Sequence, residues 1–134
     1  MERLLLIAAG GAVGALLRYG VSGMRFSYLD GIYPWGTMTA NMIGAFAIGL
    51  LWGLFESAPL STEARSFIFV GIIASFTTFS TYGLETMNLL RDGETKLAFA
   101  NIIATNVVGL LLVFVGFMLA RAMTAMFGQG VLVR

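Results

Sequence analysis

Four long apolar stretches, separated by short polar connections, dominate the residue pattern of this chain. A helix of about 20 apolar residues crosses the hydrocarbon core of a bilayer, and each stretch reaches that length. We expect helical spans near residues 4–22, 35–55, 67–90 and 97–121. The connections carry turn formers and charges, for example Arg91-Asp92-Gly93. The pattern predicts an all-α membrane protein, with a single four-span domain over residues 1–134.

The composition agrees with a bilayer environment and argues against several classes of function. Of the 134 residues, 58% are hydrophobic and 11% are charged, and the mean hydropathy is +0.88; soluble domains carry about 25% charged residues. The chain has no cysteine and no histidine, so disulfides, thiol nucleophiles and imidazole bases are excluded. We therefore expect no enzymatic activity. A net charge of +1 offers no basic patch for nucleic acid.

Basic residues are shared equally between the two sides that four spans would create. The first side, which includes both termini, carries Arg3, Arg65, Arg121 and Arg134, and the second carries Arg18, Arg25, Arg91 and Lys96. An excess of lysine and arginine normally sets the orientation of a membrane protein, so this chain is expected to insert both ways. The two orientations would supply an antiparallel, dual-topology homodimer. The alternative is that the loop charges balance by chance.

A run of hydroxyl side chains interrupts the third apolar stretch. Thr77, Thr78, Ser80 and Thr81 lie so close together that a continuous helix would turn some of them toward lipid. Because a hydroxyl in hydrocarbon needs a partner or a polar cavity, we expect a break in this helix. Its freed carbonyls would be satisfied by a cation, water or another helix. Hydrogen-bonded helix packing is the alternative interpretation.

Aromatic rings accompany these hydroxyls. Phe79 and Tyr82 are three residues apart and would share a helix face, where their ring edges carry partial positive charge. Neutral donors and ring edges suit an anion that must bind weakly enough to leave again. Lysine and arginine are nearly absent from the span interiors, so a tight anion trap is not expected.

Other polar side chains also fall inside the predicted spans. Glu85 is the one acid within a span, and a carboxylate there is a functional hypothesis by default; alternatively it pairs with Arg91 or with an arginine of a partner chain. Asn41 shares a helix face with Thr37 and could serve a pathway or bond to another helix.

The fourth span carries a stripe of polar and small residues. Asn101, Thr105 and Gly109 repeat every four residues, whereas Asn106 is expected to point elsewhere. The stripe could line a pathway or mark the place where another helix packs.

These residues resemble the signature stretches of the Fluc/CrcB fluoride channel family, over essentially the whole chain. The matching positions are Gly36-Thr37-Met38-Thr39-Ala40-Asn41, Thr77-Thr78-Phe79-Ser80-Thr81-Tyr82, Glu85 and the late arginine of the first span, Arg18. The resemblance implies a multi-pass protein of the prokaryotic cell (inner) membrane. It would be an antiparallel homodimer with two fluoride pathways, through which cytoplasmic fluoride leaves passively and becomes less toxic.

The resemblance also implies roles for single residues. Asn41 would donate its amide to fluoride, and Phe79 would offer its ring edge. The other pathway residues would be Tyr82, Ser80, Thr81, Glu85 and Thr105, with Arg18 in the aqueous vestibule. Backbone carbonyls of Ala74 and Thr77 from both chains would hold a central sodium ion. The family usually has phenylalanine at the position of Tyr82 and paired glycines at Ala74-Ser75.

Two other classes of function remain open. A small dual-topology proton-coupled exporter could use Glu85 as its proton carrier, although such exporters place their carboxylate in the first span, and residues 4–22 contain no acid. An assembly protein could use the hydroxyls only to join helices.

Overall fold

The computed structural model describes residues 1–23, 31–57 and 60–129, and within these residues the backbone forms helices and no strand. Within the part of the chain that the structure describes, four helical spans are long and apolar enough to cross a membrane. The first two are uninterrupted helices, α1 (Glu2–Gly23) and α2 (Trp35–Ser57). The predicted all-α class with four membrane-capable helices is confirmed.

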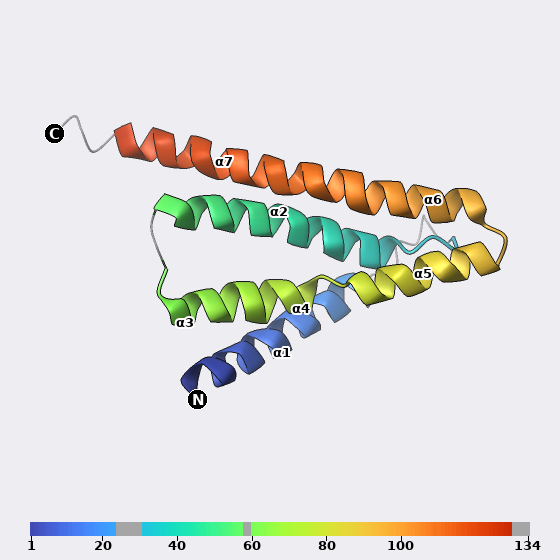
Figure 1. The fold of residues 1–134 in the computed structure, drawn as a ribbon, viewed down its shortest axis with the longest axis horizontal. Helices are drawn as coiled ribbons and strands as arrows, with labels where there is room; N and C mark the ends of the chain where they lie inside the picture. Colours follow the sequence, from blue (N-terminus) through green and yellow to red (C-terminus); the bar gives the residue numbers. More distant parts are fainter. Residues whose placement is uncertain (24–30, 58–59, 130–134) are drawn as a thin grey trace.

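The third span is broken in the middle. It begins with α3 (Thr62–Arg65), η1 (Ser66–Ile73) and α4 (Ala74–Phe76), and it resumes with α5 (Phe79–Arg91). Between α4 and α5 the backbone is extended, with φ −84° and ψ 157° at Thr77 and φ −149° and ψ 116° at Thr78. The interruption is visible between the α4 and α5 labels in Figure 1. It lies inside the hydroxyl-rich run, where the sequence predicts it.

The fourth span is a long helix with a π-helical turn inside it. Its parts are α6 (Thr95–Ile103), the π-helix η2 (Ala104–Val108) and α7 (Gly109–Gln129). A tight turn joins α5 to α6 at Gly93, whose φ of +83° suits glycine. The N–H groups of Gly93 and Glu94 donate to the carbonyls of Leu90 and Leu89 at 3.1 and 2.8 Å, which is the Schellman arrangement that ends many helices.

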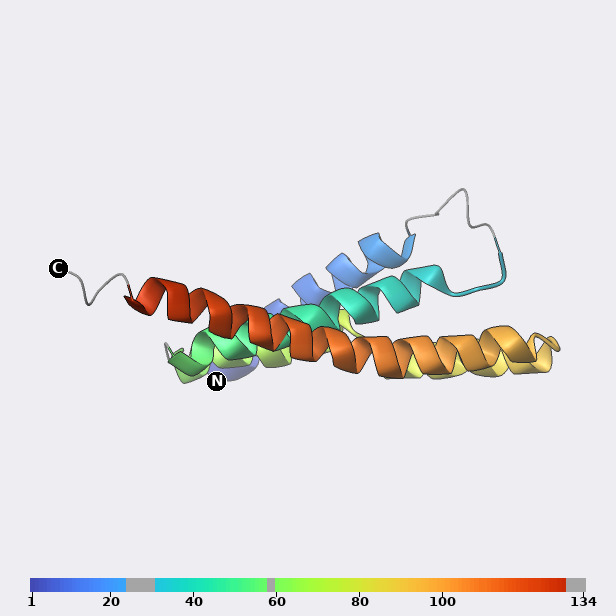
Figure 2. The ribbon, with the colours of Figure 1, turned by 90° about the horizontal axis from the view of Figure 1, so that it is seen from above.

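The spans alternate in direction. The α2 helix packs mainly against α7, and α1 packs against η1 and α4. In Figure 1 the start of α1 and the end of α7 lie at the same end of the molecule, opposite the turn between α5 and α6. Figure 2 shows the far end of α1 diverging from α7. Arg25 and Arg134, which enter the charge balance, lie outside the described residues.

Glycines permit the closest helix contacts. A methyl group at Gly10 of α1 would lie 2.5 Å from the carbonyl oxygen of Phe67 in η1. A methyl group at Gly49 of α2 would collide with the carbonyl of Val113 in α7. Small residues at such crossings let the backbones of membrane helices approach one another. These contacts position α1 beside the broken span and α2 beside α7.

Candidate functional site

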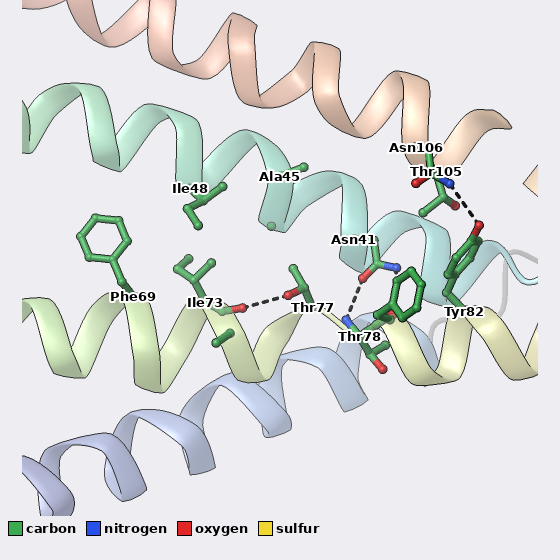
Figure 3. Close-up of a pocket in the computed structure, with 13 residues that line it drawn as sticks. Asn41, Ala45, Ile48, Phe69, Ile73, Thr77, Thr78, Tyr82, Thr105 and Asn106 are labelled. Atoms are coloured by element: carbon green, nitrogen blue, oxygen red, sulfur yellow. Dashed lines mark hydrogen bonds between the residues drawn. The ribbon is translucent and has the colours of Figure 1, made fainter. Parts of the chain in front are cut away.

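At the break, the backbone N–H and carbonyl of Thr78 have no hydrogen-bond partner within the described part of the third span, and the side chain of Asn41 on α2 takes the place of both partners. Its Oδ1 accepts a hydrogen bond from the N–H of Thr78 at 2.8 Å, and its Nδ2 donates to the carbonyl of Thr78 at 3.1 Å (Figure 3). The predicted alternative, a bond from Asn41 to another helix, is therefore present. The amide nitrogen carries two hydrogens, and the second has no acceptor among the described residues, so Asn41 retains one free donor.

The hydroxyls after the break are organised by Thr78, the N-cap of α5. Its Oγ1 accepts from the N–H of Thr81 at 3.2 Å and donates to the Thr81 hydroxyl at 2.9 Å. The Ser80 hydroxyl lies 3.4 Å from the same oxygen. Because α5 starts in mid-span, the partial positive charge of its N-terminus lies at the depth of the break. The hydroxyls of Thr78, Ser80 and Thr81 thus form one cluster in which Ser80 is exposed, whereas the Thr77 hydroxyl donates to the carbonyl of Ile73 at 3.3 Å.

Several backbone carbonyls at the break have lost their helical donors, and those of Ala74 and Thr77 are among them. In a continuous helix the carbonyl of Ala74 would accept from the N–H of Thr78, which here bonds to Asn41. The carbonyl of Thr77 would accept from the N–H of Thr81, which bonds to the Thr78 hydroxyl. Among the described residues neither carbonyl receives another donor. Such oxygens in mid-membrane need a cation, water or a polar group of another chain.

A cavity of about 420 Å³ lies beside the break, between α2, the third span and the fourth span (Figure 3). It gathers most of the residues that the sequence assigns to the pathway and the sodium site: Asn41, Phe79, Tyr82, Thr105, Ala74 and Thr77. The Tyr82 side chain is buried and that of Phe79 is 80% exposed. Their ring centroids are 5.4 Å apart and the rings are tilted by 55°. Phe79 therefore borders the cavity on its outward side.

A second cavity, of about 400 Å³, lies between α1, the start of α2 and α5. It brings together Arg18, Thr81 and Glu85, three further predicted residues, and Thr37 also lines it. Thr78 lines both cavities, so the two meet at this residue. Ser80 lines neither of these two cavities, and its side chain is exposed.

Glu85 is held on one side only. Its Oε1 accepts a hydrogen bond from the Thr37 hydroxyl at 2.7 Å, whereas its Oε2 is buried and has no partner among the described residues. Arg91 does not fill this role, because its Nε lies 3.4 Å from Asp92 Oδ1. The unpaired oxygen must be met by water, a cation or a nearby donor, and Arg18 lines the same cavity.

In the stripe on the fourth span, one residue packs against another helix and another lines a cavity, which are the two uses predicted for it. Asn101, 1% exposed, donates from Nδ2 to the Thr86 hydroxyl at 2.9 Å. That hydroxyl donates to the Tyr82 carbonyl at 2.8 Å. Asn101 therefore joins α6 to α5, while Thr105, one turn later, lines the first cavity.

Asn106 was expected to point away from this stripe, and that prediction is wrong. Its side chain lines the same cavity as Thr105, and its Nδ2 donates to the Tyr82 hydroxyl at 3.1 Å (Figure 3). Asn106 lies in the π-helical turn of η2, where the spacing of side chains around the axis departs from that of a regular α-helix. Regular helical spacing contains no signal for such a turn.

Comparison with known sequences identifies the relatives of the chain. The family described as CrcB-like protein, Camphor Resistance (CrcB), matches residues 5–117. The fluoride-specific ion channel FluC of Salinibacter ruber is 50% identical over 116 residues, which cover 87% of each chain. Proteins of the same name from Parabacteroides distasonis and Thermus thermophilus are 40% and 43% identical, over 94% and 92% of this chain and 98% of each relative.

Proposed function

This chain belongs to the CrcB family, and from that premise we propose that it is a fluoride-selective channel of the prokaryotic cell membrane. Cytoplasmic fluoride would leave through it down the electrochemical gradient, which would reduce fluoride toxicity. The relatives named above are called ion channels, not enzymes. The observation that carries the proposal is the pair of cavities that meet at Thr78, beside a helix N-terminus in mid-span.

The route would run from one cavity to the other. Fluoride would enter beside Arg18, pass the hydroxyls of Thr78 and Thr81, and reach the free amide hydrogen of Asn41 and the ring edge of Phe79. Each of the last four groups is neutral, so it can replace part of the water shell of the ion without trapping it. The N-terminus of α5 would add a favourable partial charge where the two cavities meet.

A second copy in the opposite orientation would close this route. Phe79 and Asn106 are exposed although they line the first cavity, and a polar group such as the Asn106 amide needs a protein partner or water at this depth. The balance of basic residues supports the antiparallel arrangement. Because the chain lacks cysteine, Asp92→Cys provides a unique label in the turn after α5. An impermeant thiol reagent should modify about half of the chains from one side of the membrane if both orientations occur equally.

A sodium ion at the centre of the dimer fits the freed carbonyls of Ala74 and Thr77. Each has lost its helical donor, and no group of three or more acidic side chains is available as a metal site within the described residues. Two oxygens do not enclose an ion, so the second copy would supply the matching pair. Bound there, sodium would neutralise partial negative charge in mid-membrane. Alanine and serine at 74 and 75 leave the carbonyls in place, since backbone atoms would be the ligands.

The proposal is tested with purified protein in liposomes loaded with potassium fluoride. We expect a fluoride electrode to record efflux that follows the fluoride gradient and continues after a protonophore has removed any proton gradient. Efflux that stops with the proton gradient would favour the exporter that uses Glu85. An absence of fluoride movement would contradict both a channel and a fluoride exporter.

A further inference from the structure

The hydroxyl of Tyr82 is fixed at the wall of the first cavity. Tyr82 lies on α5 one turn after the break, and its side chain is 7% exposed. Its oxygen accepts a hydrogen bond from Nδ2 of Asn106 at 3.1 Å, and the sticks in Figure 3 show the two groups meeting between α5 and the fourth span. This contact joins two helices at the depth of the cavity.

The direction of this hydrogen bond is set by a third group. The other hydrogen of Asn106 Nδ2 goes to the carbonyl of Ile102 at 2.8 Å. A carbonyl only accepts, so turning the amide over would place two acceptors against each other. The nitrogen of Asn106 therefore faces Tyr82, whose oxygen is the acceptor.

The hydrogen of the Tyr82 hydroxyl is left without a fixed acceptor. A phenol can donate one hydrogen bond while its oxygen accepts another, and the bond to Asn106 uses only the oxygen. Among the described residues no acceptor takes the hydrogen of Tyr82, which is free to turn into the cavity. Accepting a bond also polarises the O–H group and strengthens it as a donor.

An O–H donor favours fluoride over larger halides. Fluoride concentrates its charge in a small volume, so a short O–H contact recovers more of its lost hydration than the same contact recovers for chloride. A ring edge, by comparison, is a weak donor. On the premise of the proposed function, we infer that Tyr82 gives fluoride its O–H hydrogen and that Asn106 is a positioning residue that aims it.

The placement of Asn106 supports this role. Asn106 is exposed on η2. An apolar side chain at this position would cost less free energy within a bilayer, and a polar residue at such a depth is by default a functional hypothesis. Asn106 lines the same cavity as its neighbour Thr105. A purely structural bond between α5 and α6 already exists through Asn101 and Thr86.

A double-mutant cycle in liposomes tests the inference. Tyr82→Phe removes the hydroxyl but keeps the ring, and Asn106→Leu removes the amide at similar size. We expect each variant to raise the half-saturating fluoride concentration about tenfold, the effect of one charge-assisted hydrogen bond. The double variant should be no worse than Tyr82→Phe alone, because Asn106 would act only through the hydroxyl. The control Val107→Ala, on the same turn, should behave as wild type.

Each result decides between the two proposals. Wild-type protein that moves fluoride, with single variants that keep its half-saturating concentration, would overturn the role of Tyr82 and Asn106 but leave the channel intact. Losses that multiply in the double variant would show that Asn106 acts independently, and would also overturn it. Wild-type protein without fluoride flux would overturn the proposed function and this inference together. Size-exclusion profiles equal to that of the wild type establish that the variants are assembled. If Tyr82→Phe does not assemble, Asn106→Leu is sufficient for the test. An unchanged half-saturating fluoride concentration in that variant overturns the inference.

Discussion

Asn41 and Thr78 exchange two hydrogen bonds, at 2.8 and 3.1 Å, across the space between α2 and the broken third span. The exchange satisfies both polar backbone groups of Thr78, much as a neighbouring strand would. The break is consequently held by a side chain of another helix. A single amide thus maintains the extended backbone and still has one hydrogen to offer.

Replacing Asn41 should therefore affect both stability and conduction. Asn41→Leu leaves the N–H and carbonyl of Thr78 unpaired, at a cost of about 1–3 kcal/mol for each buried group. We expect a lower melting temperature in detergent and a loss of fluoride efflux. The control is Ile43→Ala on the same helix, where the side chain is 47% exposed. An Asn41→Leu protein with wild-type melting temperature and flux would contradict this assignment.

The ring of Phe79 should matter for flux and not for assembly. Phe79→Ile removes the ring edge from the border of the first cavity, while an apolar side chain of similar reach remains. We expect fluoride efflux to fall about tenfold or more, since one favourable contact with the ion is lost, with an unchanged elution volume. The matched control is Phe99→Ile on α6, whose exposed ring does not line the first cavity. Equal flux in the two variants would remove the ring of Phe79 from the mechanism.

Glu85 separates a channel from a proton-coupled exporter. In Glu85→Gln the amide oxygen can still accept from the Thr37 hydroxyl, and a negative charge disappears from the second cavity. A passive anion route should tolerate this change or conduct better, because the carboxylate repels fluoride. The rate of passive fluoride efflux from liposomes, compared between Glu85→Gln and the wild type, measures the effect of the substitution directly. Abolished transport, together with drug resistance conferred by the wild type, would instead identify Glu85 as a proton carrier.

The glycine contacts predict opposite effects for the same substitution at two sites. Gly49→Ala places a methyl group against the Val113 carbonyl and should push α2 away from α7, lowering the melting temperature. Gly20→Ala places its methyl group where no atom lies within 4 Å, and should raise helix stability by up to about 1 kcal/mol. The melting temperatures of the two variants and the wild type, measured by thermal unfolding, test both expectations. A Gly49→Ala protein that melts at or above the wild-type temperature would show that the contact between α2 and α7 is looser than described.

Much of the fold follows from the sequence because apolar length and hydroxyl density act locally. The four spans and the break at Thr77 and Thr78 arise in this way. The third and fourth helices nevertheless start earlier than the apolar runs, at Thr62 and Thr95. Polar first turns are poorly marked by hydropathy, and here Ser61 caps α3 by accepting from the N–H of Ala64.

The site is less predictable, because its contacts depend on how helices meet. Thr37 and Asn41 were expected on one face, and both bond to the third span. Their partners, Glu85 and the backbone of Thr78, could not be assigned from spacing. Asn106 was misplaced because a π-helical turn leaves no trace in the apolar pattern. The antiparallel dimer and the sodium site concern a second copy and remain predictions.

The central claim is that neutral donors at the break replace the water shell of fluoride. It is tested most directly by efflux from liposomes that contain equal fluoride and chloride, followed with an electrode for each ion. We predict rapid fluoride loss while chloride loss stays at the rate of protein-free liposomes. Comparable loss of both ions would contradict the claim, because a route that admits either halide does not depend on donors fitted to the smaller one.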